Sequence, residues 1–306
     1  MWKNKKESKK GKTLFVTFVK WLLMWACDVV PGVSGWTIAF ITGIYERLIT
    51  ALSNINFKIF PLLAKWKIRQ IRTLIDANFL FSLLVGIVLS IFTLAWVIEK
   101  ILQAQPHLLY GFFVGLIAAS IVLMMKKMKK RNRSQWFALL LGCLWGLIII
   151  NLTPMTLYPS WWMIILSAAI AICAMILPGI SGSFLLLIMG MYPHVLQAVN
   201  EINSGFLLLF ALGIVTGLLL FVHFAKRALK HYHDITVATL IGLMIGSYPK
   251  IRPRQNLVPH ESLFTNLALP ADYHAQAQLW MVILLAILGV AIVMWIHHMS
   301  IAKDAS

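Results

Sequence analysis

The sequence predicts an all-α, polytopic membrane protein built from two inverted repeats of five segments each. Three observations predict this fold: the composition, a row of apolar segments, and a Pro-Gly motif that occurs twice. The chain has 306 residues, of which 60% are hydrophobic and only 12% are charged. In an ordinary soluble domain about a quarter of the residues are charged, so this composition excludes a water-soluble protein.

Ten apolar segments account for the membrane prediction. They are residues 14–30, 33–52, 79–98, 108–125, 136–152, 161–177, 180–199, 206–225, 235–248 and 279–296. A helix satisfies its backbone polar groups internally, and it needs about 20 residues to cross the hydrocarbon core. The first, second, sixth and seventh segments barely reach that length. Each of these two pairs is therefore predicted to be a hairpin of broken or re-entrant helices, with bounds 14–52 and 161–199.

The distribution of positive charge predicts the orientation of the chain in the membrane. The net charge is +17, from 27 lysines and arginines against 10 acidic residues. One ten-segment topology places all but four of these cations on the same side, which the positive-inside rule identifies as the cytoplasm. Both tails, residues 1–12 and 300–306, are then cytoplasmic. Because this rule accounts for the excess of cations, a nucleic-acid partner is not expected.

A repeated motif divides the chain into two copies of one five-segment unit. The sequence Pro31-Gly-Val-Ser-Gly35 recurs as Pro178-Gly-Ile-Ser-Gly182, at an offset of 147 residues. A second set of matches has an offset of 127 and pairs Gly115, Leu116 and Ser120 with Gly242, Leu243 and Ser247. We therefore assign residues 13–152 to repeat 1 and residues 153–299 to repeat 2. Five crossings are an odd number, so the second copy is inverted relative to the first, as in many secondary transporters.

The interrupted helices predict a binding site for an anion. Proline and glycine break a helix and leave backbone groups that lipid cannot satisfy, so each motif must face protein or a polar cavity. The N–H groups at the start of each following helix, with nearby hydroxyls, suit a phosphate better than a cation. The candidate phosphate-binding residues are Ser34, Gly35 and Thr37 in the first copy and Ser181, Gly182 and Ser183 in the second. The alternative is that these small residues only allow close helix packing.

Ionisable residues near the breaks are candidates for coupling or gating, because charges are costly inside a membrane. Asp28 precedes the first break, where it would carry a coupling proton or cap the broken helix. Glu46 and Arg47 lie at the far end of the second segment, where a transport role and an ordinary interfacial pairing fit equally well. Arg252 and Arg254 lie on the outer side and are candidates to attract an anionic head group, against the alternative of a solvated basic loop.

Metal and cofactor chemistry is not expected from the sequence. Cys27, Cys143 and Cys173 lie in apolar runs without the spacing of metal ligands, and they predict no disulfide framework. His231 and His233 lack accompanying ligands and are interpreted as interfacial residues. No Walker loop, nucleotide fingerprint or nucleophile elbow occurs, so ATP-driven pumping is not supported.

The motifs resemble those of the PopT family of polyprenyl-phosphate translocases. Residues 28–47 and 176–183, which contain the two Pro-Gly motifs, carry a resemblance that extends over nearly the whole chain. It implies a multi-pass protein of the bacterial inner membrane that moves undecaprenyl phosphate, the lipid carrier of cell-wall precursors, from the outer to the inner leaflet. One departure is that large rings, Trp21, Trp25 and Trp36, stand where glycines are common in that family. We therefore expect different packing around the first break.

The cost of burying a phosphate in lipid and the resemblance to the PopT family both lead to the hypothesis that the protein transports the head group. Burying an isolated charge is costly, whereas a polyprenyl tail can stay in lipid, so the protein has to shelter only the phosphate. The two repeats would rock about this phosphate near the midplane, driven by coupling to a proton or sodium ion. The oligomeric state stays open.

Two other functions stay open. A membrane-embedded polyprenyl-diphosphate phosphatase is one, since such enzymes also have inverted repeats and a Pro-Gly-x-Ser element. Gly182 stands where that chemistry needs an arginine, and no pair of glutamates lies in an apolar segment, which disfavours an enzyme. A small-anion transporter is the other, because the same helix ends could serve it.

Overall fold

The computed structural model consists of helices joined by short turns. It describes residues 35–55, 61, 65–85, 100–101, 105–128, 132–152, 158–251 and 276–304. The elements are α2 (Gly35–Ile41), α3 (Tyr45–Ser53), α5 (Ile68–Leu74), α7 (Pro106–Lys127), α8 (Arg133–Ile150), α9 (Trp161–Ile176), α10 (Gly182–Ile188), α11 (Tyr192–Asn200), α12 (Ser204–His231), α13 (His233–Ser247), the 3-10 turn η1 (Tyr248–Ile251) and α14 (Gln276–Asp304). No strand occurs in the described ranges, and the prediction of an all-α fold is confirmed.

Three of the described helices are long and apolar enough to cross a membrane, judged by length and composition. They are residues 108–126 of α7, the whole of α8 and the whole of α12. The number is four if α10 and α11, which are bent by 107° at their break, form one span. Three further apolar helices are shorter: α9, α13 and residues 279–295 of α14. The predicted segment 14–30 and most of the segment 79–98 lie outside the described residues.

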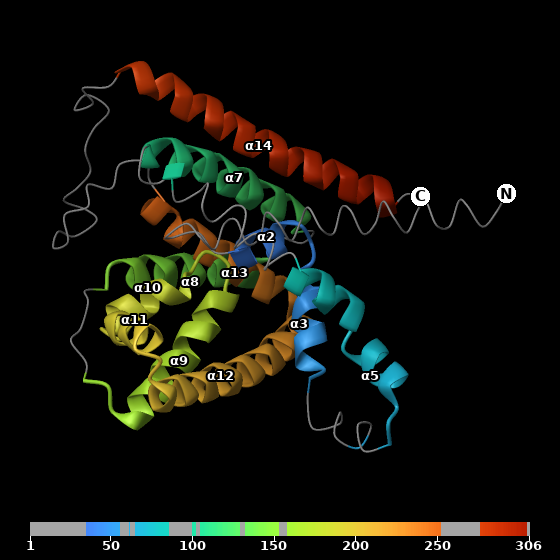
Figure 1. Ribbon diagram of the computed structural model, residues 1–306. Coiled ribbons are helices and arrows are strands. Elements are labelled where there is room, and N and C mark those ends of the chain that lie inside the picture. The colour runs from blue at the N-terminus through green and yellow to red at the C-terminus, as the bar shows by residue number, and fades with distance from the viewer. Residues whose placement is uncertain are drawn as a thin grey trace.

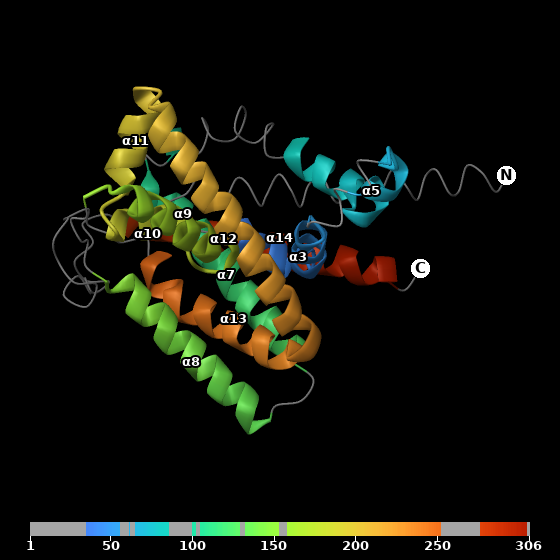
Figure 2. The same ribbon diagram turned by 90° about the horizontal axis from the view of Figure 1, so that it is seen from below.

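The long helices form three closely packed pairs, α7 with α14, α8 with α13, and α9 with α12 (Figures 1 and 2). Glycines bring the two backbones of each pair together. A Cβ atom on Gly115 of α7 would lie 1.9 Å from the carbonyl oxygen of Ala286, and one on Gly242 of α13 would lie 2.1 Å from that of Leu139. These positions require glycine, because a backbone atom cannot move aside as a side chain can.

The contacts of two of these pairs are related by the offsets found in the sequence. Gly242 follows Gly115 by 127 residues, and Ala286 follows Leu139 by 147 residues. A second set of related contacts joins Gly142 to Thr239 and Gly289 to Phe112. The fourth segment of each copy thus packs against the fifth segment of the other copy.

Each of the predicted segments 33–52 and 180–199 contains two short helices instead of one. These two pairs of helices match when the offset of 147 residues is applied. Helix α2 then matches α10, and α3 matches α11, with the same first and last positions. Gly43 lies between α2 and α3, and Gly190 lies between α10 and α11. Their φ angles are positive, at +73° and +67°. Glycine adopts such angles without the steric cost that a Cβ atom brings. The same pair of short helices, with a glycine between them, therefore occurs twice in the chain.

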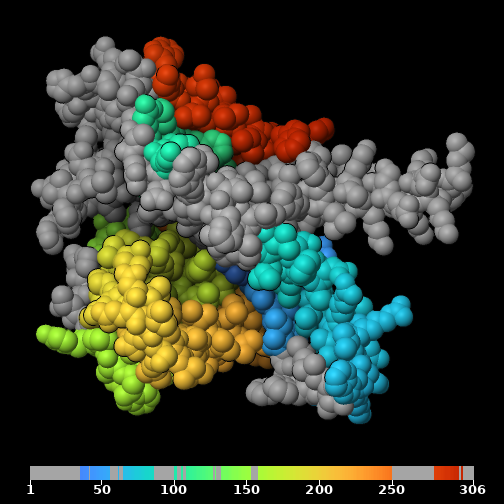
Figure 3. Space-filling view, in the orientation of Figure 1, coloured from blue at the N-terminus to red at the C-terminus, as the bar shows by residue number. Residues whose placement is uncertain are grey.

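The helix ends that carry the predicted cytoplasmic cations lie on one side of the molecule, at the right of Figure 1. The end of α12 meets the end of α3, where the Nζ atom of Lys226 donates a 2.8 Å hydrogen bond to Oδ1 of Asn54. Residues 65–85, cyan in Figure 3, lie beside α3 on this side. The Nδ2 atom of Asn54 donates a 2.8 Å hydrogen bond to the carbonyl oxygen of Leu74.

Candidate functional site

A hydrogen bond joins the second Pro-Gly motif to α2, the helix that begins at Gly35. Thr37, on α2, is fully buried, and its Oγ1 atom accepts a 2.9 Å hydrogen bond from the backbone N–H of Gly179. Gly179 has a φ of +88°, and a Cβ atom there would lie 2.5 Å from Oγ of Ser247, the last residue of α13. Helix α2, the second Pro-Gly motif and the end of α13 therefore meet at Gly179.

Two hydroxyls lie side by side where α10 begins. The Oγ atoms of Ser181 and Ser183 are 2.8 Å apart, with Ser181 half-buried and Ser183 exposed. Ser181 occupies the N-cap position of α10, but its side chain makes no capping hydrogen bond. A serine hydroxyl is both donor and acceptor, so this pair can donate to the oxygens of one phosphate. Among the candidate hydroxyls that the structure describes, these two bond each other, whereas that of Thr37 accepts from a backbone N–H.

Gly182 and Trp36 pack the helices around the two breaks. A Cβ atom on Gly182 would lie 2.6 Å from the carbonyl oxygen of Ala171, so glycine allows the start of α10 to rest on α9. Trp36 is buried, and its ring meets the ring of Tyr45 edge-on at 6.0 Å between centroids. This large ring fills the angle between α2 and α3. Gly35 is buried at the start of α2.

Several predicted site residues lie outside the described residues. They are Asp28, Ser34, Arg252 and Arg254.

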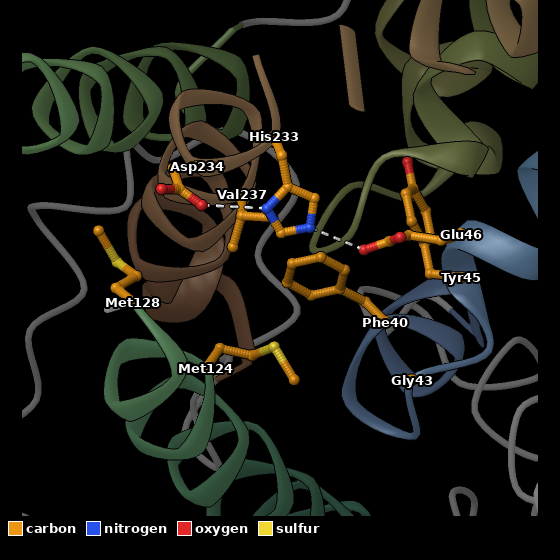
Figure 4. Close-up of a pocket in the computed structure, with 9 residues that line it drawn as sticks. All are labelled: Phe40, Gly43, Tyr45, Glu46, Met124, Met128, His233, Asp234 and Val237. Carbon is orange, nitrogen blue, oxygen red and sulfur yellow. Dashed lines mark hydrogen bonds and ion pairs between the residues drawn. The ribbon is translucent and has the colours of Figure 1, made fainter. Parts of the chain in front are cut away.

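Glu46 belongs to a cluster of ionisable side chains that joins α3 to α13 (Figure 4). The Nε2 atom of His233 lies 3.0 Å from Oε1 of Glu46, and its Nδ1 atom lies 3.1 Å from Oδ1 of Asp234. His233 precedes the apolar segment 235–248 and its side chain is about half exposed, at 51%. The hydrogen bond to Asp234, together with the interactions with Glu46, raises the pKa of His233 against the opposing effect of desolvation. An imidazolium that donates from both nitrogens fits this geometry.

A cavity of about 120 Å³ lies beside this cluster. Its apolar lining includes Phe40, Met124, Met128 and Val237. Figure 4 shows the ring of His233 between the carboxylates of Asp234 and Glu46. The cavity is therefore bordered by α2, α7 and α13. Since Phe40 lies one helical turn after Thr37, the cavity is close to the point where α2 meets the second motif.

Arg47 makes a different set of contacts from its neighbour Glu46. Its Nε atom lies 2.6 Å from Oδ2 of Asp76, and its guanidinium carbon lies 4.2 Å from the centre of the Phe79 ring. Arg47 therefore connects α3 to a residue 29 positions later in the chain. A role of Arg47 in coupling stays a prediction.

His233 and Asp234 were not among the predicted site residues. The sequence predicts an interfacial position for His233. No motif connects this histidine to Glu46, which lies 187 residues earlier. The signal that was available is an adjacent His-Asp pair between a basic stretch and an apolar segment. In the part of the chain that the structure describes, no group of three His, Cys, Asp or Glu side chains is placed to hold a metal ion.

Comparison with known proteins gives the family of this chain. The polyprenyl-phosphate transporter of Vibrio cholerae serotype O1 is 45% identical over 249 residues, which cover 79% of this chain and 80% of that protein. The polyprenyl-phosphate transporter of Staphylococcus aureus is 29% identical over 258 residues, which cover 78% of this chain and 86% of that protein. No solved structure matches the chain significantly. Residues 24–262 match the family described as undecaprenyl phosphate translocase-like, so the resemblance seen in the motifs is confirmed and the chain belongs to this family.

Proposed function

We propose that this protein is a translocase that moves undecaprenyl phosphate from the outer to the inner leaflet of the bacterial inner membrane. The returned carrier lipid would be reused in cell-envelope synthesis. The observation that carries the proposal is family membership over residues 24–262, together with the 45% identity to a polyprenyl-phosphate transporter. The apolar helices fit this function because the polyprenyl tail can stay in lipid while the protein shelters the charged phosphate.

Two inverted repeats provide the moving parts in this proposal, residues 13–152 and residues 153–299, with both tails in the cytoplasm. The related contacts of α7 with α14 and of α8 with α13 support two copies that share their fourth and fifth segments. The helix pairs α2–α3 and α10–α11 have equivalent positions in the two copies. This equivalence supports a pair of re-entrant elements that approach from opposite faces. Rocking of one copy against the other would then expose the site to each leaflet in turn.

The phosphate is proposed to bind between the two Pro-Gly motifs. Ser181 and Ser183 are its donors in the second copy, because their hydroxyls are adjacent and do not cap α10. Ser34 is assigned the corresponding role in the first copy. Thr37, Gly35 and Gly182 contribute by shaping the two breaks, and the hydrogen bond from Gly179 to Thr37 supports their joint action.

Coupling and gating are assigned to ionisable residues near the breaks. Asp28 and Glu46 are the candidates to bind a coupling proton or sodium ion. The contact of Glu46 with His233 would open and close as α3 moves relative to α13, with Arg47 holding α3 to Asp76. Arg252 and Arg254 are proposed to attract the head group at the outer leaflet.

Selective binding tests this proposal against its rivals. The purified protein is expected to bind a polyprenyl phosphate but not the corresponding polyprenol, measured by native mass spectrometry in detergent. It is expected to release no phosphate from polyprenyl diphosphate and to pass no ionic current in bilayers. Equal binding of both lipids would contradict head-group recognition, phosphate release would favour the phosphatase, and current would favour the small-anion transporter.

A further inference from the structure

Residues 65–75, which we call the basic segment, are unusually exposed for a chain so rich in apolar residues. They include α5, in which no residue is buried. The side chain of Trp66 is 83% exposed and that of Ile68 is 60% exposed. Four cations lie in the same stretch: Lys65, Lys67, Arg69 and Arg72. A large aromatic ring and isoleucines beside so many cations are typical of helices that lie in a membrane surface.

The apolar and basic side chains of this segment lie on different faces of the helix. At about 100° per residue, Ile68, Ile71, Leu74 and Ile75 fall within one arc of roughly 120°. Arg69 and Arg72 fall beside this apolar arc, on the next part of the helix circumference. The segment is thus amphipathic, with a row of cations along one edge of its apolar face.

Hydrogen bonds hold the basic segment at the end of a membrane helix. Asn54 connects it to α12, because this side chain bonds both the carbonyl oxygen of Leu74 and the ammonium group of Lys226. Lys226 directly follows the apolar segment 206–225 of α12. Asp76, just beyond the segment, is held by Arg47 of α3. The segment is therefore fixed at the level where α12 leaves its apolar stretch (Figure 3).

The charge of the basic segment is not compensated within the described part of the protein. Asp76 is the single acidic residue between positions 65 and 85, and it pairs with Arg47. None of the ion pairs between described residues involves Lys65, Lys67 or Arg69. A hollow on this segment is lined by the donor side chains of Arg69, Arg72, Thr73 and Asn78, together with the carboxylate of Asp76 that pairs with Arg47. An anionic partner with phosphate oxygens complements this surface.

We infer that the basic segment lies in the cytoplasmic membrane surface and binds the head groups of anionic phospholipids. Its apolar arc and Trp66 enter the boundary between head groups and acyl chains, while the cations contact phosphates of the surrounding leaflet. The inference goes beyond substrate transport, because it concerns the bulk lipids of the membrane and would hold for any cargo. Its consequence is that lipid composition sets the position of the segment, and through Asn54 that of α3.

Hydrogen exchange of the full-length protein in nanodiscs tests this inference. We expect the amides of residues 65–75 to exchange several-fold more slowly in phosphatidylcholine mixed with phosphatidylglycerol than in phosphatidylcholine alone. Added salt should reduce this difference, because it screens charges at the surface. The same exchange rate in both lipids would overturn the inference. This comparison uses the wild-type protein, so a folding defect of a variant cannot obscure it.

A pair of variants with equal loss of charge locates the effect. Lys65→Gln, Lys67→Gln and Arg69→Gln together should abolish the difference between the two lipid compositions. The control variant combines Arg133→Gln, Arg227→Gln and Lys230→Gln, three exposed cations on other elements, and should keep the difference. If the control variant also lost the slower exchange of residues 65–75 in anionic lipid, the net charge of the protein alone would explain the effect. That result would also overturn the inference.

Discussion

At the scale of single residues, the adjacent hydroxyls of Ser181 and Ser183 are the most direct test of the proposed phosphate site. Replacing both by alanine should lower the initial rate of polyprenyl-phosphate transfer by about 10- to 100-fold, because a hydrogen bond to a charged group contributes about 1.5–3 kcal/mol. The rate is measured in liposomes that contain the purified variant. Ser134→Ala, at an exposed serine of α8, is the matched control. Transfer at the wild-type rate by the double variant would remove these serines from the site.

Thr37 has a separate role, which is to hold the second break against the first copy. Thr37→Val keeps the shape of the side chain but leaves the partly buried N–H of Gly179 without its acceptor. The loss of one buried hydrogen bond should lower the free energy of unfolding by about 1–3 kcal/mol. Thr37→Ser keeps the hydroxyl and should stay closer to the wild type. Thermal unfolding in detergent gives the comparison, and equal stability of the two variants would contradict this role.

His233 predicts a dependence of stability on pH. Two carboxylates raise its pKa in the folded protein, so its contribution is complete below the ordinary histidine pKa and is lost as the pH rises through the raised value. The contribution is expected to be about 1 kcal/mol or less, because the side chain is half exposed. Part of the thermal stability of the wild type should therefore disappear as the pH rises from the ordinary histidine pKa of 6.5 through the raised pKa of His233.

The variant His233→Gln should lack this part of the pH dependence. His223→Gln is the control, since the ring of this exposed histidine lies 2.7 Å from the carbonyl oxygen of Leu219 instead of a carboxylate. The melting temperatures of both variants are measured across the same pH range. The account fails here if His233→Gln and the wild type lose stability in parallel.

At the scale of elements, the pairs of helices depend on glycines at equivalent positions of the two copies. Gly115→Ala and Gly242→Ala each place a Cβ atom against a backbone carbonyl of the partner helix. Each should lower the free energy of unfolding by roughly 1–3 kcal/mol, since the helices have to separate. Gly205→Ala is the control, because the nearest atom to its Cβ is Oδ1 of Asn203 at 3.6 Å. Unfolding of all three variants at one temperature would contradict the glycine contacts.

The break between α9 and α10, at the second Pro-Gly motif, could be predicted from the sequence. The interruptions at Gly43 and Gly190, and the partners of the long helices, could not. Proline and glycine leave a local signature, and the same local signature occurs twice, so the positions of the breaks follow from residues close together in the chain. Helices α7, α8 and α13 are apolar nearly all round, and such helices carry no single stripe that identifies a partner. The pairing of α7 with α14 depends on close glycine contacts that only the folded structure reveals.

Some residues of the candidate site could be predicted from the sequence, and some of its contacts could not. Ser181, Ser183 and Thr37 could be selected from the motifs, because hydroxyls beside a helix break have few other reasons to be there. The contact of His233 with Glu46 could not, since the two residues are far apart in sequence and both are exposed. The hydrogen bond that Thr37 accepts from Gly179 could not be foreseen either, because the two residues are 142 positions apart in the sequence.

At the scale of the whole molecule, the account requires that a charged head group crosses the membrane while its tail stays in lipid. The family assignment over residues 24–262 and the paired contacts of the two copies support this single function. In the proposed function, the phosphate passes between the two Pro-Gly motifs while the surrounding helices shelter it. The motion of one repeat against the other is therefore the step that has to be observed.

Transfer of a labelled polyprenyl phosphate between leaflets tests this claim most directly. The assay uses liposomes that contain the purified full-length protein, with a labelled polyprenol as the control lipid. The account predicts fast transfer of the phosphate form and no acceleration of the polyprenol, with a rate that responds to a pH or sodium gradient. Transfer of neither lipid, with and without a gradient, would contradict the account, and equal acceleration of both lipids would show that the head group is not recognised.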